Sequence, residues 1–103
     1  MTSAFSLYSD LKDRIDSKTA RVMTVGLGYV GLPLALTISE AGFPTRGLDI
    51  NEKRVAAINA GQKVISYFEE DRIANAVKGG KFAATANVAD IAEADIILIC
   101  VPT

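Results

Sequence analysis

The chain has 103 residues, half of them hydrophobic, and its 11 basic and 12 acidic side chains leave a formal net charge of −1. No basic block stands out, so a nucleic acid is not an expected partner. Histidine is absent, which removes the commonest metal ligand, and no metal site is expected. The single cysteine, Cys100, excludes an internal disulfide.

The two ends of the sequence favour a cytoplasmic protein that continues further. The start, MTSAFSLYSDLKDRIDSK, lacks the basic and long apolar regions of a signal peptide. No apolar stretch approaches the ~20 residues that span a bilayer, so a membrane is not an expected partner. The chain stops at IILICVPT, directly after its most strand-like segment. We therefore expect the N-terminal piece of a longer protein; the alternative is a complete small domain that ends on a strand.

Residues 3–17 are predicted to form an amphipathic helix. Its apolar residues recur at helical spacing, and they are Phe5, Leu7, Tyr8, Leu11 and Ile15. Such a helix would dock on the domain or on a partner subunit, whereas a loose leader is the alternative. The chain thus divides into a leader, residues 1–19, and a domain, residues 20–103.

From residue 20 on, predicted strands alternate with predicted helices. The strands are expected at 20–27, 43–50, 81–85 and 95–102, and the helices at 29–42, 52–61, 69–78 and 87–94. Asn51 is a plausible N-cap, and Gly42 and Gly61 are plausible stops. This order predicts an α/β fold with a parallel sheet and helices on both sides. The last strand is continuously apolar and is expected to be buried on both faces.

Three glycines, Gly26-x-Gly28-x-x-Gly31, lie where the first strand passes into the first helix. Gly26 permits a tight turn, Gly28 allows a diphosphate to approach the main chain, and Gly31 allows close packing of the helix. The helix start adds unpaired N–H groups and the positive end of its dipole. The alternative is that the glycines only mark a turn, but the strand–helix setting favours a dinucleotide site.

Asp49, at the end of the second predicted strand, supports the same hypothesis. A carboxylate there can accept hydrogen bonds from both hydroxyls of an adenosine ribose and repels a 2′-phosphate, which favours NAD over NADP. Arg54, one helical turn further on, is the opposing feature, since a cation there could tolerate that phosphate. In the alternative interpretation, Asp49 is only an acid at a helix N-terminus.

Six segments, found in order between residues 20 and 103, resemble the UDP-glucose/GDP-mannose dehydrogenase family: VGLGYVGLPLA, AGF, GLDINEKRV, INAG, KFAAT and EADIILICVPT. Residues 59–85 look most like the branch that acts on UDP-N-acetylhexosamines. The resemblance implies a Rossmann-like doubly wound parallel sheet, of which this chain holds the N-terminal half with four strands. It also implies a full-length homo-oligomer that uses two NAD to oxidise the C6 hydroxyl of a UDP-sugar to a carboxylate.

Carried over residue by residue, the resemblance implies a cofactor site formed by Gly26, Gly28, Tyr29, Val30, Gly31, Asp49, Arg54, Pro102 and Thr103. The family's catalytic residues lie downstream, so the chain alone is expected to be inactive. Cys100 is expected to be a small core residue inside the last strand. The acids Glu69, Glu70 and Asp71 are expected to form a solvated helix start.

Two other functions stay open at this point. One is a stand-alone module that binds NAD(H) and signals through a partner. The other is a different NAD-dependent dehydrogenase with a similar first domain, against which GYVG and CVPT argue.

Overall fold

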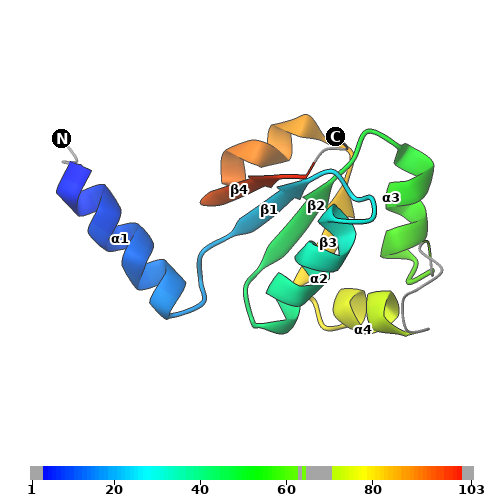
Figure 1. Cartoon of the computed structure of the whole chain (residues 1–103), viewed down its shortest axis with the longest axis horizontal. Coiled ribbons are helices and arrows are strands. Elements are labelled where there is room, and N and C mark those ends of the chain that lie inside the picture. The colour runs from blue at the N-terminus through cyan, green and yellow to red at the C-terminus, as the bar shows by residue number, and fades with distance from the viewer. Residues whose placement is uncertain (1–3, 63, 65–70, 101–103) are drawn as a thin grey trace.

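The computed structural model describes residues 4–62, 64 and 71–100 and contains an all-parallel, four-stranded sheet (Figure 1). Its strands are β1 (Val22–Val25), β2 (Thr45–Leu48), β3 (Phe82–Thr85) and β4 (Ile96–Ile99), in the spatial order β3-β2-β1-β4. Each pair of neighbours runs parallel. The strand order reverses beside β1, because β2 lies on one side of it and β4 on the other. The predicted parallel α/β sheet is confirmed.

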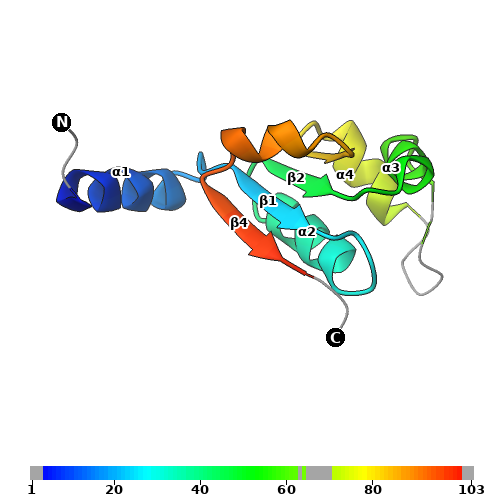
Figure 2. The same ribbon diagram turned by 90° about the horizontal axis from the view of Figure 1, so that it is seen from above.

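Helices cover the two faces of the sheet unequally (Figure 2). One face carries α2 (Gly31–Glu40), α3 (Glu52–Asn59) and α4 (Arg72–Lys78), and the other carries the 3-10 helix η1 (Val88–Glu93). The predicted order of elements is confirmed, and most observed elements are a few residues shorter than predicted, as expected where element ends fray. The predicted beginning of α4, at residues 69 and 70, lies outside the described residues.

The hydrophobic core lies between β1–β3 and the three helices on one face. Its completely buried aliphatic side chains come from the turn after β1 and from α2 and α3, and they include Leu27, Leu32, Leu36 and Ile58. Phe82 of β3 is 1% exposed and belongs to the same cluster. Removing each such side chain from water stabilises the fold by about 1.5–3 kcal/mol. The core therefore holds the turn after β1 at a defined place on the sheet.

The prediction that the last strand is buried on both faces is wrong for the described residues. Ile97 and Ile99 are 44% and 72% exposed, whereas Ile96 and Leu98 on the other face are partly buried. The physical reason is that η1 is short and lies over β1 and β2 rather than over β4 (Figure 2). The uncovered face of β4 therefore exposes a pair of isoleucine side chains.

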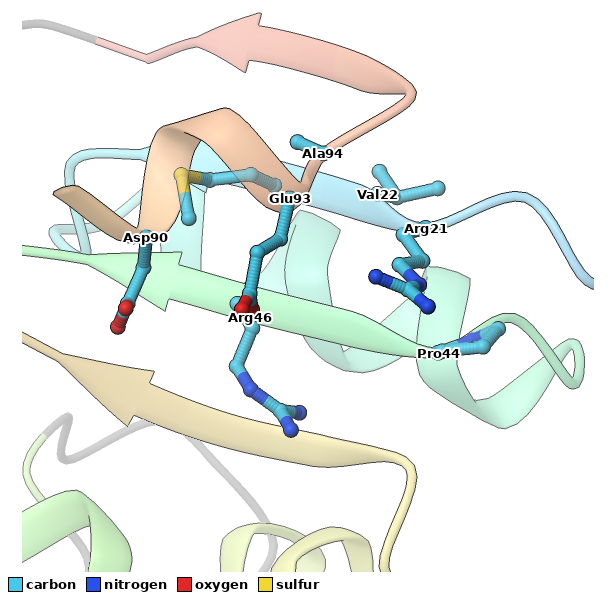
Figure 3. Close-up of a pocket in the computed structure, with 8 residues that line it drawn as sticks. Arg21, Val22, Pro44, Arg46, Asp90, Glu93 and Ala94 are labelled. Carbon is cyan, nitrogen blue, oxygen red and sulfur yellow. The ribbon is translucent and has the colours of Figure 1, made fainter.

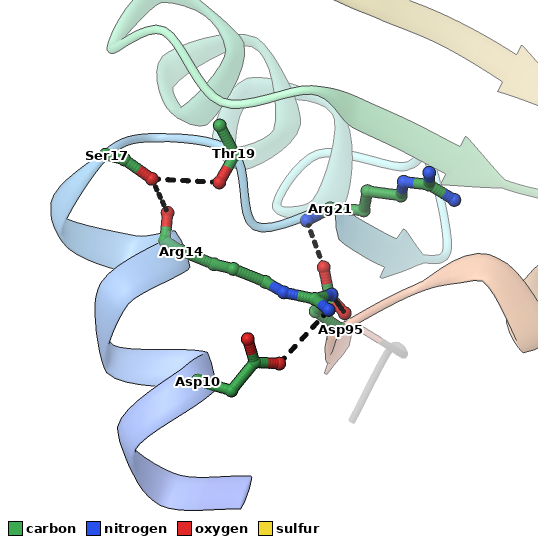
Figure 4. Close-up of polar contacts among 6 residues, drawn as sticks. All are labelled: Asp10, Arg14, Ser17, Thr19, Arg21 and Asp95. Carbon is green, nitrogen blue, oxygen red and sulfur yellow. Dashed lines mark hydrogen bonds and ion pairs between the residues drawn. The ribbon is translucent and has the colours of Figure 1, made fainter. Parts of the chain in front are cut away.

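The predicted amphipathic helix is confirmed as α1 (Ala4–Asp16), which projects from the sheet (Figure 1). Arg14 Nη1 lies 2.7 Å from Asp95 Oδ1, and the Arg21 N–H donates to the second carboxylate oxygen of Asp95 at 2.8 Å (Figure 4). Leu7 and Tyr8 stay 60% and 64% exposed, so their packing on the domain is not observed. None of the helices described here is long and apolar enough to cross a membrane.

Candidate functional site

The segments that follow β1, β2 and β4 lie side by side at the carboxyl ends of the strands. The ladder continues one residue past β1, β2 and β4 through three N–H···O=C bonds, Gly26 to Leu48 (2.8 Å), Asp49 to Thr85 (3.0 Å) and Cys100 to Val25 (2.8 Å). The glycine-rich turn, Asp49 and Cys100 therefore share one edge of the sheet. In an open α/β sheet, ligands bind at this edge, where the strand order reverses.

The three glycines of the turn have different surroundings. Gly26 has a φ of +100°, and a Cβ there would overlap the carbonyl oxygen of Cys100. A Cβ at Gly31 would overlap the carbonyl oxygen of Gly26 and lie 3.2 Å from the Cβ of Cys100. A Cβ at Gly28, in contrast, would meet no atom within 4 Å among the described residues. The turn itself thus requires glycine at positions 26 and 31, whereas Gly28 faces open space.

Leu27, between the first two glycines, is held at both of its main-chain polar atoms. Its N–H donates to Asp49 Oδ2 at 3.1 Å, and its carbonyl oxygen accepts a hydrogen bond from Arg54 Nε at 2.8 Å. Its side chain is completely buried and packs where a side chain on Gly47 would have to lie. The residues after β2 therefore set the position of the turn after β1.

Asp49 is oriented by a second contact within its own connection. Its Oδ1 accepts the Asn51 N–H at 2.9 Å. The side chain of Asn51 in turn accepts the Arg54 N–H at 3.1 Å, which confirms the predicted N-cap of α3. Each carboxylate oxygen has about two acceptor positions, so the half-buried Asp49 keeps capacity for hydroxyl donors of a ligand.

Helix α2 begins at Gly31, immediately after the turn. Its N-cap residue, Val30, offers no side-chain acceptor to the first amides. Tyr29 and Val30 are 76% and 69% exposed, so their side chains do not fill the turn from the inside. A helix start of this kind attracts an anion through its N–H groups and its dipole. The open space at Gly28, the beginning of α2 and the carboxylate of Asp49 fit a dinucleotide.

Several residues singled out in the sequence lie elsewhere or outside the described part of the chain. Pro102, Thr103, Glu69 and Glu70 belong to the segments that are not described. Cys100 follows β4 instead of lying inside it, and it is half-buried beneath the glycine-rich turn rather than enclosed in the core. Asp71 is exposed just before α4 and makes no capping hydrogen bond with its side chain, as a solvated helix start does.

Sequence reasoning missed Leu27 and Gly47. Neither residue is polar, and their importance comes from contact between β2 and the turn after β1. A single glycine inside a predicted strand often marks a close approach by another part of the chain, and Gly47 carried that signal. Leu27 carried none, because an apolar residue after a strand is common.

A cavity of about 150 Å³ lies on the η1 face, at the amino-terminal ends of β1 and β2 (Figure 3). Arg21 and Arg46 line it, together with Met23 and Glu93. Arg46 precedes Asp49 along β2, so this cavity is at the end of the sheet opposite to the glycine-rich turn. It takes no part in the candidate dinucleotide site.

Comparison with known proteins agrees with this geometry. Residues 20–103 match the sequence profile described as the UDP-glucose/GDP-mannose dehydrogenase family, NAD binding domain. A UDP-N-acetyl-D-mannosamine dehydrogenase of Methanococcus maripaludis is 40% identical over 89 residues, which are 85% of this chain and 20% of the relative. The chain spans about a fifth of the length of the curated relatives that it matches.

Two solved structures show the same fold. A UDP-D-ManNAc dehydrogenase from Pyrococcus horikoshii is 34% identical, with a TM-score of 0.74 over 79% of this chain and 20% of its own. An NDP-N-acetyl-D-galactosaminuronic acid dehydrogenase from Methanosarcina mazei is 27% identical, with a TM-score of 0.79 over 94% of this chain and 22% of its own. The glycine-rich turn, the strand order and the sequence thus agree: the chain belongs to the UDP-glucose/GDP-mannose dehydrogenase family, and its residues 20–103 match the NAD-binding domain of that family.

Proposed function

We propose that this chain supplies the adenosine and diphosphate half of the cofactor site in an NAD-dependent nucleotide-sugar 6-dehydrogenase. In this proposal the main chain from Gly26 to Gly31 holds the diphosphate, with Tyr29 and Val30 at its rim. Asp49 accepts hydrogen bonds from the ribose hydroxyls. Arg54, Pro102 and Thr103 complete the set, as the family resemblance implies.

The observation that carries the proposal is the contrast among the three glycines. Gly26 and Gly31 are needed for the fold of the turn, but no contact within the described residues requires glycine at position 28. A bare main chain facing open space at a helix start is what a diphosphate needs for close approach. The Asp49 carboxylate lies at the same edge and is already oriented by two N–H groups.

When bound, NAD accepts a hydride at each of the two oxidations that convert the sugar C6 alcohol into a carboxylate. The residues of this chain bind and orient the cofactor, and Asp49 excludes a 2′-phosphate through charge repulsion. A UDP-N-acetylhexosamine is the substrate that we propose, because the relatives named above act on N-acetylated nucleotide sugars according to their names. The sugar is read by residues beyond the fifth of the relatives' length that this chain matches.

The wider setting belongs to the same proposal. We assign residues 1–19 to a leader and residues 20–103 to the cofactor domain, since α1 projects away from the sheet (Figure 1). The family resemblance supports a homo-oligomer as the assembled form. The single cysteine, which cannot form an internal disulfide, supports a cytoplasmic location.

The test is NAD binding by this chain, measured by calorimetry, with Gly28→Val as the decisive variant. A Cβ at position 28 meets no atom within 4 Å in the described structure, so we expect little change in the thermal midpoint. The Kd for NAD should rise at least ~10-fold, which corresponds to about 1.4 kcal/mol. Ala92→Val, on the exposed surface of η1, adds a side chain of the same shape away from the turn and should leave the Kd unchanged. An unaltered Kd in a folded Gly28→Val chain would refute the diphosphate assignment.

A further inference from the structure

Arg54 is half-buried in the first turn of α3, and its side chain reaches back to the turn after β1. Its Nε donates to the carbonyl oxygen of Leu27 at 2.8 Å, across 27 positions of the sequence. No other hydrogen bond or ion pair of the Arg54 guanidinium occurs among the described residues. The polar contact that the Arg54 guanidinium makes within the described structure is therefore with the main chain of the glycine-rich turn.

The N–H and the carbonyl oxygen of Leu27 are both hydrogen-bonded by residues that follow β2. Asp49, which directly follows β2, accepts the Leu27 N–H, and Arg54, in the first turn of α3, donates to the Leu27 carbonyl oxygen. Asn51 ties these two residues to each other, because its N–H binds Asp49 and its side chain accepts the Arg54 N–H. The three residues form one hydrogen-bonded unit that holds Leu27.

This arrangement has a consequence for the open face of the turn. Leu27 directly precedes Gly28, and the carbonyl oxygen of Gly28 accepts the Leu32 N–H of α2 at 3.2 Å. If the Leu27 carbonyl were released, the peptide between Leu27 and Gly28 could rotate, and the main chain that faces the open space would lose its defined shape. A binding surface that is already shaped before the ligand arrives avoids the ordering cost of binding.

We propose that Arg54 is a positioning residue, which holds the Leu27–Gly28 peptide in the shape that receives the diphosphate and does not itself bind a 2′-phosphate. The proposal rests on the assignment of the turn to the cofactor. It differs from a direct charge contact in one measurable respect. Loss of a residue that positions the turn should weaken NAD and NADP binding equally. Loss of a cation that contacts a 2′-phosphate should weaken NADP binding alone.

The first test uses the chain without cofactor and follows amide hydrogen exchange by NMR. Arg54→Met removes the donor and the charge but keeps a long flexible side chain, and Lys53→Met removes the same charge from the exposed neighbouring residue. We expect the Leu27 and Leu32 amides to exchange at least ~10-fold faster in Arg54→Met, because their acceptors depend on the shape of the turn. The Lys53→Met variant should match the original chain. Unchanged exchange at Leu27 in Arg54→Met would overturn the proposal.

The second test measures NAD and NADP binding by calorimetry on the same variants. Arg54→Met should raise both Kd values by a similar factor, about 10-fold, so that the ratio of the two Kd values is unchanged. Arg54→Lys keeps the charge without the Nε donor and should raise both Kd values as Arg54→Met does. If Arg54→Met does not fold, Arg54→Lys takes its place in the test. A selective loss of NADP binding, or full retention of NAD affinity in Arg54→Lys, would overturn the proposal.

The two proposals fail in distinguishable ways. If the original chain binds neither dinucleotide, the assignment of the turn to the cofactor fails, and the role of Arg54 in cofactor binding fails with it. If the original chain binds NAD and Gly28→Val abolishes binding, but Arg54→Met changes neither exchange nor affinity, only the positioning role fails.

Discussion

The Asp49 carboxylate lies 3.1 Å from the main-chain nitrogen of Leu27, and this hydrogen bond joins the end of β2 to the turn after β1. The carboxylate after β2 and the glycine-rich turn are thereby parts of one hydrogen-bonded structure. The acid that we assign to the ribose therefore also holds the turn that we assign to the diphosphate. A substitution at Asp49 should therefore disturb both halves of the adenosine diphosphate site.

The first prediction concerns the choice between NAD and NADP. In Asp49→Asn, the side chain keeps its size but loses its charge and one of its two acceptor oxygens, and an amide NH₂ must face either the Leu27 or the Asn51 N–H. We expect NAD affinity to fall by about 1.5–3 kcal/mol, the usual value of hydrogen bonds to a charged group. NADP should lose less, because the repulsion of its 2′-phosphate disappears. Calorimetry with both dinucleotides measures this ratio.

A matched control for that experiment is Asp13→Asn, which removes one negative charge from the exposed surface of α1. It should leave both affinities unchanged. If Asp49→Asn and Asp13→Asn bind NAD equally well, Asp49 does not hold the ribose.

The second prediction concerns the unexpected role of Gly47. Alanine usually stabilises a strand relative to glycine, by up to about 1 kcal/mol. Here a Cβ would overlap the buried side chain of Leu27, which cannot move freely because its N–H and carbonyl are both bonded. We therefore expect Gly47→Ala to lower the free energy of unfolding by about 1–3 kcal/mol, measured by urea denaturation.

Gly28→Ala is the control for this experiment, since its added Cβ would meet no atom within 4 Å in the described structure. It should leave the urea midpoint unchanged. A Gly47→Ala chain that is as stable as the original would show that Leu27 can move aside. It would contradict the inference that the turn after β1 is held rigidly.

The third prediction concerns pH and the contact between α2 and α4. Arg72 donates from Nε and Nη2 to both oxygens of Glu40, at 3.0 and 2.8 Å, and these hydrogen bonds lower the pKa of Glu40 below its ordinary value of 4.5. A carboxyl group whose pKa is lower in the folded state stabilises the fold above its unfolded pKa. That contribution is lost as the pH falls through the lower, folded pKa.

Glu40→Gln should therefore reduce the free energy of unfolding at pH 7 and have no effect once the pH is well below 4.5. Because the Glu40 side chain is 47% exposed, the difference at pH 7 should be about 1 kcal/mol or less. In an Arg72→Met background, the same substitution should show no such pH dependence between pH 3 and pH 7. Urea denaturation across that range checks both statements, and a pH-independent effect in the original background would contradict the assigned cause.

The sequence by itself determined the order of the elements and the place of the candidate site. Glycines at 26, 28 and 31, an acid after the next strand and an N-cap at Asn51 are local signals, because each depends on backbone geometry within a few residues. The order of strands and helices then determined a parallel sheet, since the chain must cross over between parallel neighbours.

Only the tertiary structure decided which side chains hold the turn and which strand face stays uncovered. Leu27, Gly47 and Arg54 meet through contacts between residues about 20 or more positions apart, and their amino-acid types alone do not reveal such pairs. The exposure of Ile97 and Ile99 depends on where η1 lies, whereas the apolar sequence of β4 is the same whether its faces are covered or open. Local signals report what a segment can form, and packing between segments determines which of its atoms are bound, covered or left to meet a ligand.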